Sequence, residues 1–480
     1  MLIHRLYDRA FSHGDSAALS VGGQRLNYRA FAMLIEATRL YLNSAKPAGA
    51  TFALVGASSL DGWLLTIAAR AVGLHSIVLS GPKQILDLNL GVRAVVLTMG
   101  AAPAPAFAEA ATRSGSPIIA VPPSAFAAPP VLDKARLPKD DACGGHVLLT
   151  SGTTGRYKKI LVDCAAEAAR AEALGALFKA DEKSVLFMGP MGLWTSAGHN
   201  RPLATWYRGG RVVLEDSSNL AQSILREGVN QLQTTVPFLA TILDQLPSSF
   251  RRDDSIRVGL VGSSPPWALV ERAQVQLSRD INIELGSTEA GTIASSVVRT
   301  PDDLRFHHIV PERSVIVVDE AGNQTPTGVA GLVKIRLRDN DVRSYFEAPE
   351  ETARFFQGDW FLSGDLGRLD ASGRLELLGR ITDVISINGD KHSTLPYEQA
   401  LERKLAVTGA AILSAPNERG EDELHVALES FDQTLVQQAP AVSAMFPTFR
   451  RVHVRIVAQL PRNHMGKIDR LALRAVLGLG

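Results

Sequence analysis

The sequence predicts an α/β protein with a large N-terminal domain, which carries an antiparallel β subdomain, and a small α+β domain at the C-terminus. In the first hundred of the 480 residues, short apolar segments alternate with segments of helical periodicity, which is typical of a parallel sheet covered by helices. Residues 310–378 instead contain short strand-like segments separated by turn residues, as in an antiparallel sheet. The residues after 380 mix both patterns, and their number suits a separate small domain.

Individual elements follow from these patterns. The four strand-like segments of the antiparallel part read SVIVVD, GLVKIRL, WFLSGD and GRLELLG. Residues 101–139 are rich in alanine and proline, and we expect loops and connections there. In the N-terminal part, helices are expected at residues 28–42 and 62–72, and strands at residues 51–56, 77–80 and 94–98.

Composition excludes several classes of function. Hydrophobic residues make up 46% and charged residues 21%, which favours a large core over disorder. The 50 Lys and Arg balance the 49 Asp and Glu, so no basic excess would recruit nucleic acid or anionic lipid. The longest apolar stretch, residues 63–79, is interrupted by Arg70 and His75, so no membrane span is expected. Two cysteines, Cys143 and Cys164, and an N-terminus without an apolar leader predict a cytoplasmic protein with neither a disulfide framework nor a zinc cluster.

The clearest local motif is VLLTSGTTGRYKKI at residues 147–160. An apolar strand leads into small hydroxyl residues and glycines, whose backbone N–H groups can approach an anion closely. Lys158, three residues after Gly155, can reach the same anion. The motif is not a Walker A loop, because Arg156 and Tyr157 separate the glycine from the lysine. The alternative is a Gly/Thr-rich turn between two strands.

The second motif is IELGSTEAG at residues 283–291. The hydroxyl of Thr288 and the carboxylate of Glu289 are side by side, and together they could hold a phosphate and its Mg²⁺, which prefers oxygen ligands. By itself, the same Ser-Thr-Glu pattern also suits a helix N-cap.

Two further motifs carry single charged residues. Asp365 follows a strand-like segment between glycines, where a carboxylate could accept hydrogen bonds from a ribose diol, and Arg380 follows Gly379 further on. A turn aspartate is the alternative for Asp365. Lys467 stands in LPRNHMGKIDR near the C-terminus, where a surface lysine is the simpler interpretation.

The order and spacing of these motifs resemble the adenylate-forming family of acyl-CoA synthetases, aryl-CoA ligases, firefly luciferase and the adenylation domains of peptide synthetases. The resemblance covers nearly the whole chain. It rests on the motifs TSGTTG-x-x-K, GSTE, YFEAPEETARFFQGDWFLSGD, GRITDVISINGD and PRNHMGK.

The resemblance implies an N-terminal AMP-binding domain at residues 1–380, a mobile C-terminal domain at residues 383–480, and a role for each motif residue. Thr288 would bind the α-phosphate of ATP, Glu289 the Mg²⁺, and Lys467 would bridge the substrate carboxylate and the α-phosphate. The ribose would be held by Asp365 and Arg380. The remaining ATP-binding residues would be Ser151, Gly152, Thr153, Thr154, Gly155 and Lys158 at the phosphates, and Gly262, Ser263, Ser264, Leu285 and Gly286 near the adenine.

The substrate is predicted from the positions that depart from the family. Fatty-acyl and coumaroyl ligases often carry Phe-His where this chain has Gly192-Leu193, followed by Trp194. Leu193 and Trp194 are therefore expected to line the acid pocket, and Trp194 favours a small or flat apolar acid, including an aromatic one; a core position is the alternative for Trp194. The family's amino-acid-activating members place an aspartate here, which this chain lacks, so an α-amino acid is disfavoured.

Three hypotheses about function remain open on the sequence. In the first, the acyl-AMP is transferred to coenzyme A, with Gly389 in the thiol tunnel. In the second, the acceptor is the phosphopantetheine of a carrier protein, which has the same pantetheine arm. In the third, the chain is a silent relative that binds nucleotide without catalysis. Departures at Tyr157, Lys159 and Thr382 allow this, whereas the presence of Glu289, Asp365 and Lys467 argues against it.

Overall fold

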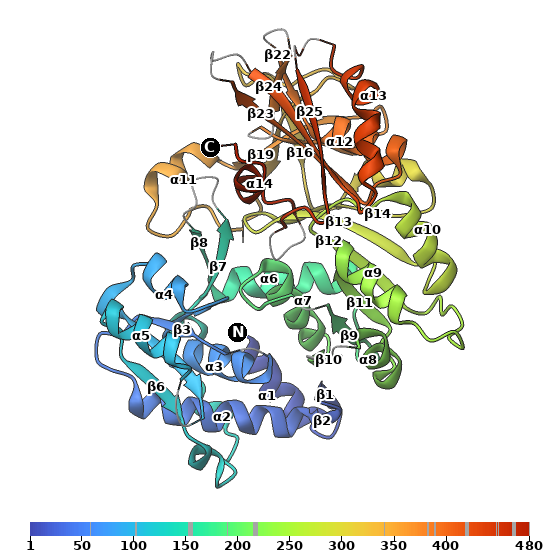
Figure 1. Ribbon diagram of the computed structural model, residues 1–480. Coiled ribbons are helices and arrows are strands. Elements are labelled where there is room, and N and C mark those ends of the chain that lie inside the picture. Colours follow the sequence, from blue (N-terminus) through green and yellow to red (C-terminus); the bar gives the residue numbers. More distant parts are fainter. Residues whose placement is uncertain are drawn as a thin grey trace.

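The computed structural model has the predicted α/β architecture, with C-terminal residues forming a separate layer above the rest (Figure 1). It describes the whole chain except residues 58, 101–102, 152–156, 190, 215–218, 340, 382–383, 388–389, 418–421, 448, 450, 463–466 and 480.

A six-stranded sheet forms the lower left of the molecule in Figure 1 and has the strand order β6-β5-β3-β4-β7-β8. Its first four strands are parallel, and β7 and β8 form an antiparallel hairpin at one edge. The predicted helices and parallel strands are confirmed. The bounds are β3 (Phe52–Val55), β4 (His75–Val78), β5 (Ala94–Met99), β6 (Ile118–Val121), β7 (His146–Ser151) and β8 (Tyr157–Val162), with α1 (Leu2–Ser12), α2 (Tyr28–Ala45), α3 (Ser59–Ala71) and α4 (Lys83–Asp87).

The expectation of loops and connections at residues 101–139 is wrong in part. Helix α5 (Pro105–Ser114) and strand β6 lie there, and β6 pairs in parallel with β5. Proline does not prevent this helix because Pro105 stands in its first turn, where a backbone N–H would lack a partner in any case. Gly115, with φ 69°, ends the helix in the left-handed conformation.

The large sheet joins a parallel part to the predicted antiparallel part. Strands β1, β10, β9, β11, β12 and β13 are parallel neighbours in that order, and the strands from β13 to β16 are antiparallel. The parallel part comprises β1 (Ala17–Val21), β9 (Val185–Met188), β10 (Arg211–Leu214), β11 (Gln231–Thr235), β12 (Arg257–Val261) and β13 (Ile281–Ser287), and β2 (Gln24–Asn27) is antiparallel to β1. The antiparallel part continues with β14 (Gly291–Val297), β15 (Phe306–Ile309), β20 (Leu375–Arg380), β19 (Trp360–Leu369), β17 (Gly331–Arg336) and β16 (Val315–Val318), with β18 (Phe356–Gln357) beside β19.

Helices connect the strands of the large sheet. Helix α6 crosses the centre of the molecule in Figure 1, below the C-terminal layer and beside α7. The bounds are α6 (Cys164–Leu177), α7 (Ser196–Tyr207), α8 (Leu220–Glu227), α9 (Val236–Gln245), α10 (Trp267–Gln276) and α11 (Pro349–Phe355).

The C-terminal layer has its own sheet, β23-β24-β25, and its own apolar core, which includes Leu401, Ile412, Val426 and Phe446. It also contacts the large sheet directly, because the Ser393 hydroxyl donates a hydrogen bond to a backbone carbonyl of β20. The bounds are β21 (Val384–Ile387), β22 (Asp390–Ser393), α12 (Leu395–Leu405), β23 (Gly409–Pro416), β24 (Asp422–Glu429), α13 (Ala439–Ser443), β25 (Val452–Val457) and α14 (Arg470–Val476).

Among the described residues, no helix is both long and apolar enough to cross a membrane.

Candidate functional site

A cavity of about 2380 Å³ lies between the large sheet, helices α6 and α7, and the C-terminal layer. Residues predicted from motifs far apart in the sequence line this one cavity, namely Lys158, Gly262, Ser263, Ser264, Leu285, Gly286, Thr288, Glu289, Asp365, Arg380 and Lys467. The predicted residues Gly152, Thr153, Thr154, Gly155 and Gly389 lie outside the described residues, as does Thr382. Ser151 is the last residue of β7.

The GSTE motif forms the turn of the β13–β14 hairpin. Gly286 ends the regular pairing of β13, and β14 starts at Gly291, whose φ of 67° belongs to the left-handed region that favours glycine. The Ser287 hydroxyl accepts a hydrogen bond from the backbone N–H of Ala290 at 3.0 Å. The alternative of a helix N-cap is therefore wrong, because the chain continues into a second strand.

Two buried arginines hold this hairpin turn in place. Arg170 of α6 donates to the backbone carbonyls of Thr288 at 2.9 Å and Glu289 at 2.7 Å. Arg313 donates to the carbonyl of Ala290 and pairs with Asp341. Burial lowers the pKa of Arg170 to about 10, so its guanidinium is still charged at neutral pH. The turn is thus positioned by charged donors, which make stronger hydrogen bonds than neutral ones.

The carboxylate of Glu289 and the ammonium group of Lys158 lie on the same side of the cavity. Glu289 is buried, and its Oε1 accepts a hydrogen bond from the Tyr345 hydroxyl at 2.8 Å. The Lys158 Nζ lies 3.7 Å from the centre of the Phe355 ring and 4.8 Å from that of Tyr345. Burial lowers the pKa of Lys158, and the charge of Glu289 opposes that change. The cavity therefore offers a carboxylate for a metal ion and an ammonium group for a phosphate, close to each other.

Asp365 and Arg380 face each other across β19 and β20 as directly paired residues. The Arg380 Nε lies 2.9 Å from Asp365 Oδ1, and its Nη1 donates to the backbone carbonyl of Ser363 at 2.8 Å. Burial raises the pKa of Asp365, and the Arg380 charge opposes this rise. The expected turn around Asp365 is instead an irregular stretch within β19, where Gly364 has a φ of 74°.

Lys467 comes from the C-terminal layer and lines the cavity beside these residues. The positive charge of Lys467, like that of Arg380, opposes the rise that burial causes in the pKa of Asp365. The two side chains therefore lie close enough to interact electrostatically. The segment that carries Lys467 is anchored by a β-bridge between Arg462 and Ile468. Lys467, the last of the motif residues along the sequence, thus reaches the cavity from the C-terminal layer.

Leu193 and Trp194 do not line this cavity. Leu193 is buried in the N-terminal core, and the half-buried Trp194 packs against the same core. Residues of α7 line the cavity in their place, among them Asn200 and Arg201. For Trp194, the structure thus favours the core position over the pocket wall.

The sequence did not point to Arg170, Arg313 or Tyr345 as residues of the site. One feature of the sequence could have indicated Arg170, because it is the only arginine in the alanine-rich helix CAAEAARAEALGAL. Arg313 lies in an irregular segment, where spacing contains no such signal. Tyr345 is the first residue of the motif YFEAPEETARFFQGDWFLSGD, in which only Asp365 was given a role.

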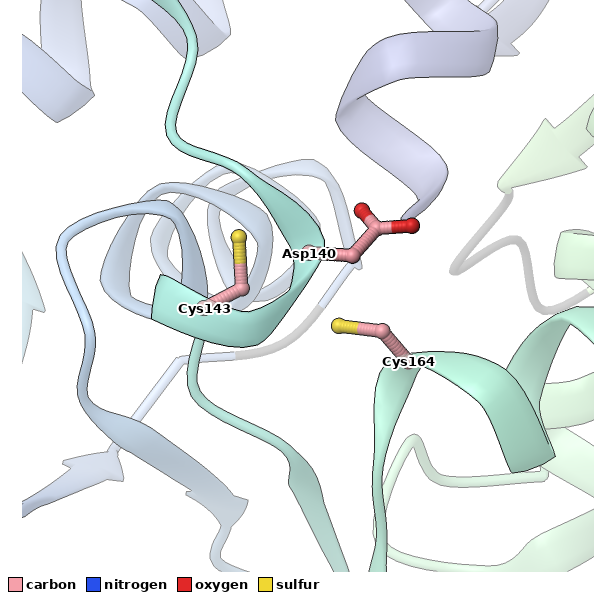
Figure 2. Close-up of side chains that lie close together, drawn as sticks. All are labelled: Asp140, Cys143 and Cys164. Carbon is pink, nitrogen blue, oxygen red and sulfur yellow. The ribbon is translucent and has the colours of Figure 1, made fainter.

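The two cysteines lie together (Figure 2), and neither of them lines the cavity. Cys143, Cys164 and Asp140 place their sulfur and oxygen atoms within 4.8 Å of one another. Both thiols are free, and Asp140 already pairs with the N-terminal amine at 2.9 Å and with His4 at 3.0 Å. The contact with Cys143 lowers the pKa of Cys164 to about 7.

Comparison with known proteins identifies the family. Residues 82–345 match the family described as AMP-binding enzyme. The chain belongs to this family. Among relatives of this AMP-binding enzyme, triostin synthetase I of Streptomyces triostinicus is 30% identical, over 72% of this chain and 67% of that protein. A salicylyl-CoA synthase / salicylate adenylyltransferase of a Streptomyces species is 29% identical, over 72% and 66%. The matches thus span about two thirds of these relatives' length.

The fold of the AMP-binding enzyme is that of solved members of the adenylate-forming superfamily. The amide bond synthetase McbA from Marinactinospora thermotolerans superposes with a TM-score of 0.83 at 22% identity, over 99% of both chains. This likeness includes the C-terminal layer, which the match to the family at residues 82–345 does not reach.

The pairing of Asp365 with Arg380 leads to a first prediction for the AMP-binding enzyme. Asp365→Ala should weaken ATP binding by about 1.5–3 kcal/mol, because a ribose diol would lose a charged acceptor. Titration calorimetry with ATP measures this. Asp359→Ala is the matched control, because Asp359 is exposed and does not line the cavity. Equal ATP affinity in wild type and Asp365→Ala would remove Asp365 from the nucleotide site.

Proposed function

We propose that the protein uses ATP to activate a carboxylic acid as its acyl-AMP, with release of pyrophosphate, and then transfers the acyl group to the thiol of coenzyme A, with release of AMP. The observation that carries this proposal is the convergence of Lys158, Glu289, Asp365 and Lys467, from four distant segments, on one cavity. Such a set offers cations for phosphates, a carboxylate for a metal, and an acceptor for a ribose.

The physical task of the site is to let one anion attack another. A carboxylate approaching the α-phosphate of ATP is repelled until the charge of both groups is offset. Lys467 would offset charge that builds on the α-phosphate, and Lys158 would hold the outer phosphates, while the walls of the cavity align the reacting groups. Attack of a carboxylate oxygen on the α-phosphorus forms the acyl-AMP and expels pyrophosphate.

The donor set on the β13–β14 turn fits a magnesium ion. Glu289 and Thr288 supply a carboxylate and a hydroxyl at the cavity wall, and Mg²⁺ prefers oxygen ligands while keeping several waters. The Tyr345 hydroxyl, which donates to Glu289, would fix the orientation of that carboxylate. When bound, the ion would supply positive charge to the phosphates.

Pyrophosphate exchange tests the first half of the proposal. With a panel of carboxylic acids, we expect ATP-dependent exchange for acids without an α-amino group, including aromatic ones; the salicylate named for one relative is a suitable member of the panel. No exchange with any acid, despite binding of ATP, would instead support the silent nucleotide-binding relative.

The acceptor is tested separately. Acyl-AMP formed in situ is offered coenzyme A, a phosphopantetheinylated carrier protein, or an amine, and the product is identified by mass spectrometry. We propose coenzyme A first and the carrier protein as the alternative, because both present the same pantetheine thiol. An amide product would overturn the thiol proposal while leaving adenylation intact.

We further propose that residues 1–380 and 383–480 behave as two domains whose relative orientation changes during the reaction. Two features support this proposal. The C-terminal layer has its own apolar core, and Lys467 reaches the cavity from this layer. Limited proteolysis should cleave between residues 380 and 392, at a rate that changes when ATP and acid are added. Resistance to cleavage there under both conditions would contradict the proposed mobility.

A further inference from the structure

Besides the nucleotide residues, the cavity lining has an apolar part and a polar part, which we call its polar end. The apolar part includes Ala173, Leu174 and Leu177 of α6 and Ala197 of α7. The polar end comprises three polar side chains from three different elements, namely Arg201 of α7, Gln233 of β11 and Glu284 of β13. The proposed reaction does not use any of the three.

These side chains are buried, yet part of their hydrogen-bonding capacity is unused. The exposed fraction is 2% for Arg201, 2% for Gln233 and 9% for Glu284. In the described part of the protein, the Arg201 Nε and Nη1, the Gln233 Oε1 and the Glu284 Oε1 have no hydrogen-bond partner. A buried polar group left without a partner is destabilising, because it has lost its hydrogen bonds to water. Such groups call for a specific explanation, and a ligand that completes their hydrogen bonds is one.

Arg201 and Glu284 are oriented by their other contacts. The Arg201 guanidinium stacks 3.5 Å from the centre of the Phe178 ring, and its Nη2 donates to Gln231 Oε1 at 3.3 Å. The amide of Gln233 donates to Glu284 Oε2 at 3.4 Å. Within the described residues, no ion pair of 4.0 Å or less joins Arg201 to Glu284. A fixed donor and a fixed acceptor thus face the cavity without meeting each other.

The charges of this pair select the chemistry of the missing partner. An ammonium group would be repelled by Arg201, and a carboxylate would be repelled by ionised Glu284. Burial raises the pKa of Glu284 to about 7, and the Arg201 charge opposes this rise. A neutral hydroxyl can accept a hydrogen bond from Arg201 and donate one to Glu284, so it satisfies both groups.

We propose that Arg201, Gln233 and Glu284 recognise a hydroxyl group at the end of the acid substrate that is farthest from its carboxyl. This inference rests on the proposed function, because it requires the acid to lie in this cavity. Glu284 belongs to β13, whose hairpin turn carries Thr288 and Glu289, so the proposed recognition residues and the proposed reaction site line one cavity. The substrate class is then a hydroxylated acid.

The test compares acids that differ only in the distal group. Pyrophosphate exchange is measured with benzoate, para-hydroxybenzoate and terephthalate, and with hexanoate and its ω-hydroxy derivative. For wild type, kcat/KM should be at least about tenfold higher for the hydroxylated acid than for its unsubstituted counterpart in at least one of the two pairs. The acid without the hydroxyl leaves buried polar groups of the protein unpaired. Glu284→Leu and Arg201→Met should each reduce this preference to about twofold or less. Glu284→Gln, which can still accept a hydrogen bond, should keep much of the preference.

Glu271→Leu is the matched control, because it makes the same change at an exposed position of α10. It should leave the preference unchanged. Equal kcat/KM for both members of each pair, or a preference that survives Glu284→Leu and Arg201→Met, would overturn the inference and indicate that water fills the polar end. A preference for terephthalate would overturn it in favour of a second carboxylate. Absence of exchange with every acid would overturn the proposed function itself, which is a distinct result.

Discussion

Replacing Lys467 by alanine should slow acyl-AMP formation by about a thousandfold, which is at the upper end of the effect of removing one group that stabilises developing charge. Lys467 lines the same cavity as Thr288, Glu289 and Asp365, although it comes from the C-terminal layer. Charge builds between two anions in this half-reaction, and a cation has its greatest effect there. Single-turnover formation of acyl-AMP, measured by rapid quench, gives the rate.

The second half-reaction distinguishes a catalytic from a structural role for Lys467. Supplied with synthetic acyl-AMP and coenzyme A, Lys467→Ala should form thioester at a nearly normal rate, because the acyl group is already activated. Lys404→Ala, at an exposed lysine of α12, should leave both half-reactions unchanged. Equal losses in both half-reactions would mean that Lys467 is structural or that the domains do not reorient. No loss in either would remove Lys467 from the mechanism.

Arg170→Met should slow adenylation by at least about 100-fold, since small displacements of positioned groups have effects of this size. Arg170 donates to the backbone carbonyls of both Thr288 and Glu289, and it is buried. Each hydrogen bond from a charged donor contributes about 1.5–3 kcal/mol. Without Arg170, the turn that presents the Thr288 hydroxyl and the Glu289 carboxylate loses two of its supports.

The test must separate positioning from a general loss of stability. We expect Arg170→Met to lower kcat far more than it raises the KM for ATP, when rates are expressed per folded molecule counted by active-site titration. Arg170→Lys retains the charge but can satisfy the two carbonyls less well, so it should recover part of kcat. Arg136→Met, at an exposed arginine, is the control. A normal kcat with only a lower melting temperature would restrict Arg170 to a structural role.

The local sequence pattern predicted helices and strands well in segments where a single hydrophobic periodicity dominated. Alternating apolar segments in the first hundred residues indicated the parallel strands β3, β4 and β5 and the helices α2 and α3. Composition misled at residues 101–139, because proline in a first helical turn and glycine after the last one are compatible with helix α5. Ser-Thr-Glu fits a helix N-cap as well as a hairpin turn, and only the pairing of β14 with β13 excludes the cap.

Many residues of one cavity could be predicted from the motifs, because phosphate, metal and ribose chemistry demands particular side chains and the chain presents them in one order. The part of the cavity wall near α7 could not be predicted, since Trp194 and Arg201 are only seven positions apart and their direction depends on how α7 packs. The core contacts place Trp194 away from the cavity and Arg201 along it.

The sequence alone indicated the family and the α/β class, and it picked out Glu289, Asp365 and Lys467, because these depend on residue type and order. Only the tertiary structure showed that Arg170 donates to the turn of Thr288 and Glu289, and that Arg201 and Glu284 line the same cavity. Both arrangements bring together residues more than eighty positions apart. They depend on which faces of α6, α7 and β13 pack together, and local periodicity contains no information about packing partners between distant segments.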